Sequence, residues 1–80
     1  MADLRRFTRI RPEQNEQRWY VVAWAPTLFD TWGVILAWGR LDDNRYRQRI
    51  LEFPTPDEAA AEARTQMERR LKRGYTERPA

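Results

Sequence analysis

The 80-residue sequence contains no cysteine and no histidine. Disulfides, thiolate metal sites and imidazole ligands are therefore excluded together, and so are Ser/His and Cys/His catalytic pairs. A small chain without these groups must be held together by apolar packing. We therefore expect a binding domain with no cofactor and no metal, and not an enzyme.

Long apolar runs are also absent. No run exceeds the seven residues of Trp32 to Trp38, whereas a helix that spans a bilayer needs about 20. The charges at the start of the chain have no apolar stretch behind them, so no secretory signal is indicated. We expect a cytoplasmic protein with no membrane partner.

Aromatic residues and arginine are abundant. Four Trp, three Tyr and three Phe can supply a compact core. Fifteen basic residues against twelve acidic ones give a net charge of +3, and 14 of the bases are arginine, which pairs bidentately with phosphate. The surplus lies in residues 1–50, with nine Arg and six acids, while residues 51–80 are balanced. This composition favours nucleic acid as the partner.

Residue patterns predict four strands, each rich in β-branched, aromatic or arginine residues and bounded by proline or short polar turns. They span residues 4–11, 18–24, 32–40 and 45–53. Short connections between consecutive strands make an antiparallel meander. Both faces of residues 18–24 are apolar, which predicts a central strand covered on both sides.

A helix is predicted after the last strand. Thr55-Pro56-Asp57-Glu58 has the form of a capping box, and Gly74 is placed to end the helix after Arg73. An apolar stripe for the sheet recurs at three and four residues: Ala60, Ala63, Met67 and Leu71. We expect a single α+β domain over residues 1–80, with an antiparallel sheet of about four strands and one C-terminal helix packed on one face. Its core covers about residues 4–75, and residues 1–3 and 76–80 are expected to be flexible.

The tripeptide Trp38-Gly39-Arg40 ends the third expected strand, and a capped helix follows after one more strand. On these features the chain resembles the WGR domain family, which is named for the tripeptide, and is similar to its short free-standing bacterial members. Further matching residues are Trp19-Tyr20, Trp32, Phe53, Glu58-Ala59 and Lys72-Arg73-Gly74-Tyr75. The resemblance covers roughly residues 4–75.

WGR domains accompany poly(ADP-ribose) polymerases, where they contact a DNA end and relay that contact to neighbouring domains. The resemblance implies that Trp38 stacks on a terminal nucleotide and that Arg40 contacts DNA or a neighbouring domain. Family members often carry a glycine two positions after the motif arginine, where this chain has Asp42. Asp42 and Asp43 would also repel phosphate beside the expected site.

Arg45, Arg47 and Arg49 alternate along the fourth expected strand, so their side chains leave one face about 6.6 Å apart. This spacing suits a stripe that follows phosphates, with Arg40 nearby as a fourth charge. The alternative is an ordinary solvated strand face. Strict alternation would put apolar residues on the same face, and a bulge near Leu51 would relieve that conflict.

The remaining candidates have structural interpretations. Gly39 is expected to serve backbone geometry, through a bulge or a close approach, and three tryptophans are assigned to structure: Trp19, Trp24 and Trp32. A basic group near the start either binds nucleic acid or lies on a solvated edge strand: Arg5, Arg6, Arg9 and Arg11. A second basic group complements the helix dipole: Arg69, Arg70, Lys72 and Arg73.

The first hypothesis is a nucleic-acid-binding domain that contacts duplex DNA ends or nicks, with DNA favoured over RNA and a role in DNA repair. The second is a protein-interaction module that docks on a larger DNA-processing or DNA-repair enzyme through Arg40 and the Asp42-Asp43 turn. A net charge of only +3 keeps the second hypothesis open. Self-association through an exposed sheet edge is a third alternative.

Overall fold

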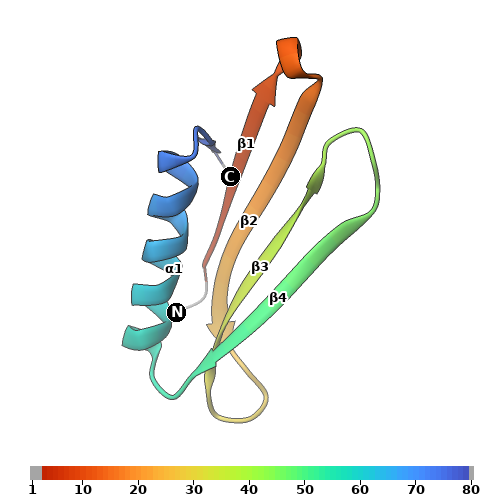
Figure 1. Ribbon diagram of the computed structural model, residues 1–80. Coiled ribbons are helices and arrows are strands. Elements are labelled where there is room, and N and C mark those ends of the chain that lie inside the picture. The colour runs from red at the N-terminus through yellow and green to blue at the C-terminus, as the bar shows by residue number, and fades with distance from the viewer. Residues whose placement is uncertain (1–2, 80) are drawn as a thin grey trace.

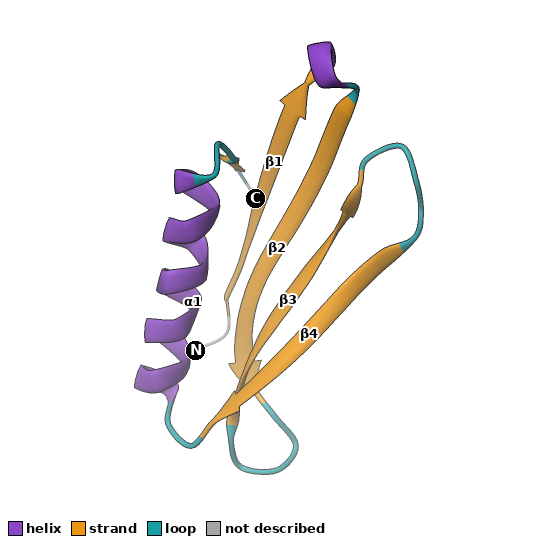
Figure 2. Ribbon diagram, viewed as in Figure 1, coloured by secondary structure: helices purple, strands orange, loops and turns teal. Residues whose placement is uncertain are grey.

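The computed structural model describes residues 3–79. Met1, Ala2 and Ala80, for which flexibility is expected, lie outside the described residues. The described elements are, in chain order, β1 (Asp3–Arg11), the short 3-10 helix η1 (Pro12–Gln14), β2 (Glu16–Pro26), β3 (Trp32–Arg40), β4 (Tyr46–Phe53), α1 (Pro56–Lys72) and β5 (Thr76–Arg78). The strands form an antiparallel sheet in the order β4-β3-β2-β1-β5, and α1 lies along one of its faces (Figure 1). The predicted α+β fold with one helix on one face is therefore confirmed, and Figure 2 shows its two layers.

The four predicted strands are all present, and β3 has the predicted bounds. The sheet has a fifth strand, because β5 pairs with β1 from Arg6↔Arg78 to Thr8↔Thr76. This strand is three residues long and exposed along its length, so no apolar alternation marks it in the sequence. It forms because the chain returns past the end of α1 to the free edge of β1.

Both ends of α1 follow the predicted signals. The Thr55 hydroxyl oxygen accepts a hydrogen bond from the Glu58 backbone N–H at 3.2 Å, and the hydroxyl donates to the Glu58 carboxylate at 3.0 Å. Gly74 closes the helix with φ of +87°, a conformation that favours glycine. Within the described residues, no helix is long and apolar enough to cross a membrane.

The stripe that the helix turns to the sheet is only partly the predicted one: Ala63 and Met67 pack on the core as expected, whereas Leu71 does not. Its buried residues are Ala59, Ala63, Gln66 and Arg70. Ala60 is half-buried, and Leu71 is 52% exposed. The fully buried Ala59 and Ala63 have small side chains that let α1 approach closely. This orientation places Arg70, in place of Leu71, against the sheet.

The prediction that both faces of β2 are covered is wrong. Tyr20 and Val22 point toward α1 and are buried. Trp19, Val21 and Ala23 point to the opposite face, where they stay half-buried because no described element packs over them. The strand is central within the sheet, between β1 and β3, but only one of its faces belongs to the core.

The predicted bulge in β4 is also absent. The pairing of β3 with β4 is unbroken from Trp32↔Phe53 to Gly39↔Tyr46. Leu51 and Phe53 pack against the core, whereas Ile50 points away from α1 and is 55% exposed. The arginines of β4 therefore share the α1-facing side with Leu51 and Phe53, as strict alternation requires.

Candidate nucleic-acid interface

The α1-facing side of the sheet ends in arginine and aromatic side chains near the C-terminal end of α1. A pocket of about 390 Å³ lies at this end of the sheet, where Trp19 and Tyr46 reach it from the opposite face; its lining residues are Arg18, Trp19, Trp38, Gly39, Arg40, Asp43, Arg45, Tyr46, Arg47 and Tyr75. A neighbouring pocket of about 260 Å³ is lined by Arg9, Arg18, Tyr20, Trp38, Arg70, Arg73 and Tyr75. The two share Arg18, Trp38 and Tyr75, and we call them together the cationic pocket. Asp43 is the one acidic residue among these lining residues, so the surface favours an anion.

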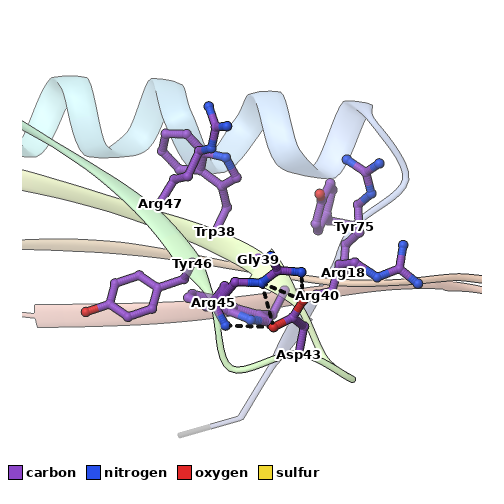
Figure 3. A pocket seen from close by; sticks show the side chains of 10 residues that line it. Arg18, Trp38, Gly39, Arg40, Asp43, Arg45, Tyr46, Arg47 and Tyr75 are labelled. Atoms are coloured by element: carbon purple, nitrogen blue, oxygen red, sulfur yellow. Dashed lines mark hydrogen bonds and ion pairs between the residues drawn. The ribbon is translucent and has the colours of Figure 1, made fainter.

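Trp38 is half-buried at the centre of the cationic pocket. One side of its indole is stacked on Tyr20, with ring centroids 5.7 Å apart and planes 11° apart. Tyr75 meets Tyr20 edge-on at 6.2 Å. Figure 3 shows Trp38 and Arg47 on the helix side of the sheet. This packing holds the indole rigidly while part of it stays accessible.

Arg40 and Arg45 are held by the acidic residues of the β3–β4 turn. Arg40 Nε lies 3.0 Å from the Asp42 carboxylate, and Arg45 Nη2 lies 2.8 Å from that of Asp43, as the dashed lines for Arg45 in Figure 3 show. Hydrogen bonds from these guanidinium groups lower the pKa of both Asp42 and Asp43. In the ligand-free protein the two carboxylates therefore already neutralise the charges of Arg40 and Arg45.

Arg47 and Arg49 differ from Arg40 and Arg45. Both are exposed, and no ion pair or side-chain hydrogen bond among residues 3–79 involves either of them. Arg47 lies directly across from Trp38 in the neighbouring strand, and Arg49 lies across from Leu36. Of the four arginines proposed from the sequence, these two are therefore available for a ligand.

Arg70 was assigned to the helix dipole, but it belongs to the cationic pocket. Its side chain is buried, with 9% of the residue exposed, and its guanidinium carbon lies 4.3 Å from the centroid of the Tyr20 ring. The Arg70 Nε is buried without a hydrogen-bond partner in the described residues. Burial lowers the pKa of Arg70, although an arginine stays protonated in proteins. A buried cation without a carboxylate is costly, and an anion in the pocket would relieve that cost.

The basic group of β1 divides in two. Arg5 pairs with Glu77 at 3.0 Å, and Arg6 donates to the Pro79 carbonyl. Arg9 instead lines the cationic pocket, where it pairs with Glu16 and lies 4.8 Å from the Tyr75 ring centroid. Arg9 is therefore the one arginine of this group that lines the cationic pocket, and Glu16 already neutralises it.

Gly39 allows a close approach of side chains across β3. A Cβ at this position would lie 2.9 Å from the Arg45 carbonyl oxygen and 3.0 Å from Trp19 Nε1. The Trp19 ring crosses the strand here and meets Tyr46 with centroids 6.0 Å apart. The register on both sides of Gly39 is unbroken, so the glycine serves packing and not a bulge.

These features define a small α+β domain with a cationic, aromatic pocket at one end of its sheet. The family model of the WGR domain matches residues 4–80, and the chain belongs to that family. WGR domains are in general nucleic-acid-binding modules. No curated protein and no solved structure gives a match to the chain. Residues 3–79 contain no cluster of acidic side chains arranged to hold a metal ion.

Proposed function

We propose that this protein binds duplex DNA at ends or nicks, as a binding module and not as an enzyme, and that it acts in DNA repair. The observation that carries the proposal is the set of arginines without acidic partners around a half-buried, rigidly packed Trp38. A terminal base pair exposes one flat face, and an indole held by Tyr20 can pack on it at little entropic cost. Arg47, Arg49 and Arg70 then bind phosphates on either side of the ring.

The motif arginine has a smaller role in this proposal. Arg40 and Arg45 must exchange Asp42 and Asp43 for phosphate, so their net contribution to affinity is reduced. Arg47 and Arg49 gain phosphate contacts without losing an ion pair. The unpaired arginines therefore dominate the salt dependence of binding.

The test compares a short duplex that has blunt ends with the same duplex closed by hairpins at both ends, across a salt series. We expect tighter binding to the open duplex and a steep loss of affinity as salt is added. The logarithm of the binding constant should fall with the logarithm of the salt concentration, with a slope of about −0.9 for each phosphate contacted. Equal affinity for the two duplexes would overturn end recognition and leave a general charge interaction. No binding to either would overturn the nucleic-acid role.

Trp38→Leu and Trp32→Leu form a matched pair for the stacking role. Both tryptophans lie in β3 on the α1-facing side and pack against the core, but Trp32 lies at the opposite end of the strand and does not line the cationic pocket. We expect Trp38→Leu to weaken binding to the open duplex roughly 5- to 150-fold, since stacking of one base contributes about 1–3 kcal/mol. Trp32→Leu should lower stability without changing the affinity of the folded protein.

A second candidate function is docking on a larger DNA-processing enzyme. The uncovered face of the sheet favours it, because Val21, Ile35 and Ile50 lie there outside the core. Ile50→Glu tests this function, since it adds a charge to that face on the side away from the cationic pocket. Loss of a co-purifying enzyme with unchanged duplex binding would support it, and no change in either would overturn it.

A further inference from the structure

The loop between β2 and β3 presents two large apolar side chains to solvent. Leu28 is 97% exposed and Phe29 is 79% exposed. They are adjacent at the end of the hairpin, which is the lower loop in Figure 1. We call residues 27–31 the hairpin tip. Exposed apolar side chains gathered at one protruding point are typical of an interaction site.

The hairpin tip is held in shape by its own hydrogen bonds. The Thr27 backbone N–H donates to the Thr31 carbonyl at 2.8 Å, and the two threonine hydroxyls lie 2.6 Å apart. The Phe29 N–H donates to the Thr27 hydroxyl at 3.1 Å. A loop fixed in this way loses little conformational entropy when its side chains enter a partner.

Acidic residues surround the hairpin tip. Asp30 belongs to it, and Glu52 lies beside it, with its carboxylate 3.5 Å from the Thr31 hydroxyl. Asp57 and Glu58 are exposed in the first turn of α1, which begins at the same end of the sheet (Figure 1). These charges oppose nucleic acid and anionic membranes. They favour a partner with an aromatic pocket rimmed by arginine.

The cationic pocket has this chemistry, but the tip of the same chain cannot reach it. Trp32, next to the tip, and Trp38, in the pocket, are six residues apart along one strand, so about 20 Å. The molecule is elongated, with principal extents of 45 × 24 × 19 Å, and the tip and the pocket lie toward opposite ends of the sheet. Only a second copy can bring the two together.

We propose that the protein associates head to tail, with the hairpin tip of one copy in the cationic pocket of the next. Phe29 packs against Trp38 in the pocket, and Asp30 pairs with Arg47. The contact joins two different surfaces. A pair of copies therefore keeps one unoccupied hairpin tip and one unoccupied cationic pocket, and further copies can add to both to form an open chain. Nucleic acid then competes for the pocket; this competition rests on the proposed function, whereas the association does not.

The first experiment is sedimentation velocity of the full chain without nucleic acid, over a range of protein concentrations at low and high salt. We expect the average mass to rise with concentration at low salt and to fall toward the monomer at high salt, because complementary charges support the contact. A monomer at every concentration and salt overturns the proposal.

Two variants distinguish this contact from a symmetric dimer. Phe29→Ser removes the tip and keeps the pocket, and Arg47→Glu disables the pocket and keeps the tip. Each variant alone should be monomeric. A mixture of the two should form one-to-one pairs that do not assemble further, because each pair has no second working tip and no second working pocket. Leu71→Ser, which removes an apolar side chain that is 52% exposed on α1, should associate like the unmodified chain. Association of Phe29→Ser alone, or no pairing in the mixture, overturns the proposal.

Addition of a short blunt-ended duplex separates the two proposals. Dissociation of the chains into protein–duplex complexes supports a shared pocket. Association that persists while the duplex also binds places nucleic acid elsewhere on the protein and overturns the proposed site for DNA, with the head-to-tail contact intact.

Discussion

The space between α1 and the sheet has two halves with different contents. Toward the hairpin tip it is apolar, with Val22, Val34, Ala59 and Ala63 all buried. Toward the C-terminal end of α1, arginines surround three aromatic rings, those of Tyr20, Trp38 and Tyr75. We call these the apolar half and the arginine half. One layer of the molecule is thus purely apolar at one end, while at the other end buried aromatic rings lie among arginines.

Two of the elements that form this layer change from apolar residues to arginine along their length. Along the α1-facing side of β4, Phe53 and Leu51 are followed by Arg49 and Arg47. In α1, Ala59 and Ala63 are followed by Gln66 and Arg70. The alternation of faces never breaks; only the kind of side chain changes. A pocket lined by arginine can therefore form beside a continuous core without any special backbone feature.

The largest expected effect lies in the apolar half. Leu36→Ala removes a side chain that is 3% exposed and packed beside Val22 and Val34. We expect the free energy of unfolding to fall by about 2–5 kcal/mol, measured by urea denaturation. The affinity of the folded protein for duplex should not change. A large loss of affinity in a folded variant would contradict the separation of the two halves.

Arg70→Met tests the arginine half. We expect duplex affinity to fall roughly 10- to 150-fold, because a hydrogen bond to a charged group contributes about 1.5–3 kcal/mol. The free energy of unfolding should not decrease, since the variant removes a buried cation that has no carboxylate partner. Arg69→Met is the matched control, because Arg69 is the exposed neighbour in the same turn. Equal losses of affinity in both variants would argue for general charge alone.

Arg47→Gln and Arg45→Gln compare an unpaired arginine with a paired one. We expect Arg47→Gln to reduce the salt slope of duplex binding by about 1, as for the loss of one phosphate contact. Arg45→Gln should change it less, because Asp43 already neutralises that guanidinium. Fluorescence anisotropy across a salt series measures both, and a larger effect of Arg45→Gln would reverse the assignment.

The smallest expected effect concerns pH. The pKa values of Asp42 and Asp43 are lowered in the folded protein, so their stabilisation is present above the ordinary carboxyl pKa and is lost as pH falls through the lowered values. Asp42 is exposed and Asp43 is half-buried at the surface, so the change in stability is small. An NMR titration of the carboxyl groups checks the cause. In Arg45→Gln, the pKa of Asp43 should return toward its ordinary value while that of Asp42 stays lowered.

Local signals made much of this fold predictable. The capping box at Thr55 and the closing Gly74 depend on nearby residues only, and the strand of residues 32–40 is marked by its composition and turns. The strand β5 depends on a distant partner, β1, and has no pattern of its own. Alternation alone suggests a bulge, because it puts Leu51 on the same face as the arginines; the structure keeps them on one face, since Leu51 packs on the core while Arg47 and Arg49 stay exposed.

The candidate site was only partly predictable for the same reason. Trp38, Arg47 and Gly39 stand out in the sequence, and the structure brings all three to one pocket. Arg70 is marked only by its spacing from Ala59 and Ala63, and that spacing becomes visible once the orientation of α1 is known. The pairing of Arg40 with Asp42 depends on the shape of the turn. The roles of these residues in binding stay predictions.

The strand β4 forms one edge of the sheet, with β3 as its neighbour on one side only. An exposed strand edge offers free backbone N–H and C=O groups to any other extended chain and is a common start of aggregation. Arg47, Arg49 and Glu52 stand along this edge and are all exposed. Charged side chains in such a position discourage strand addition. The arginines proposed to hold phosphate thus also stand where they discourage edge-to-edge pairing, and we expect their replacement by apolar residues to promote aggregation as well as to weaken binding.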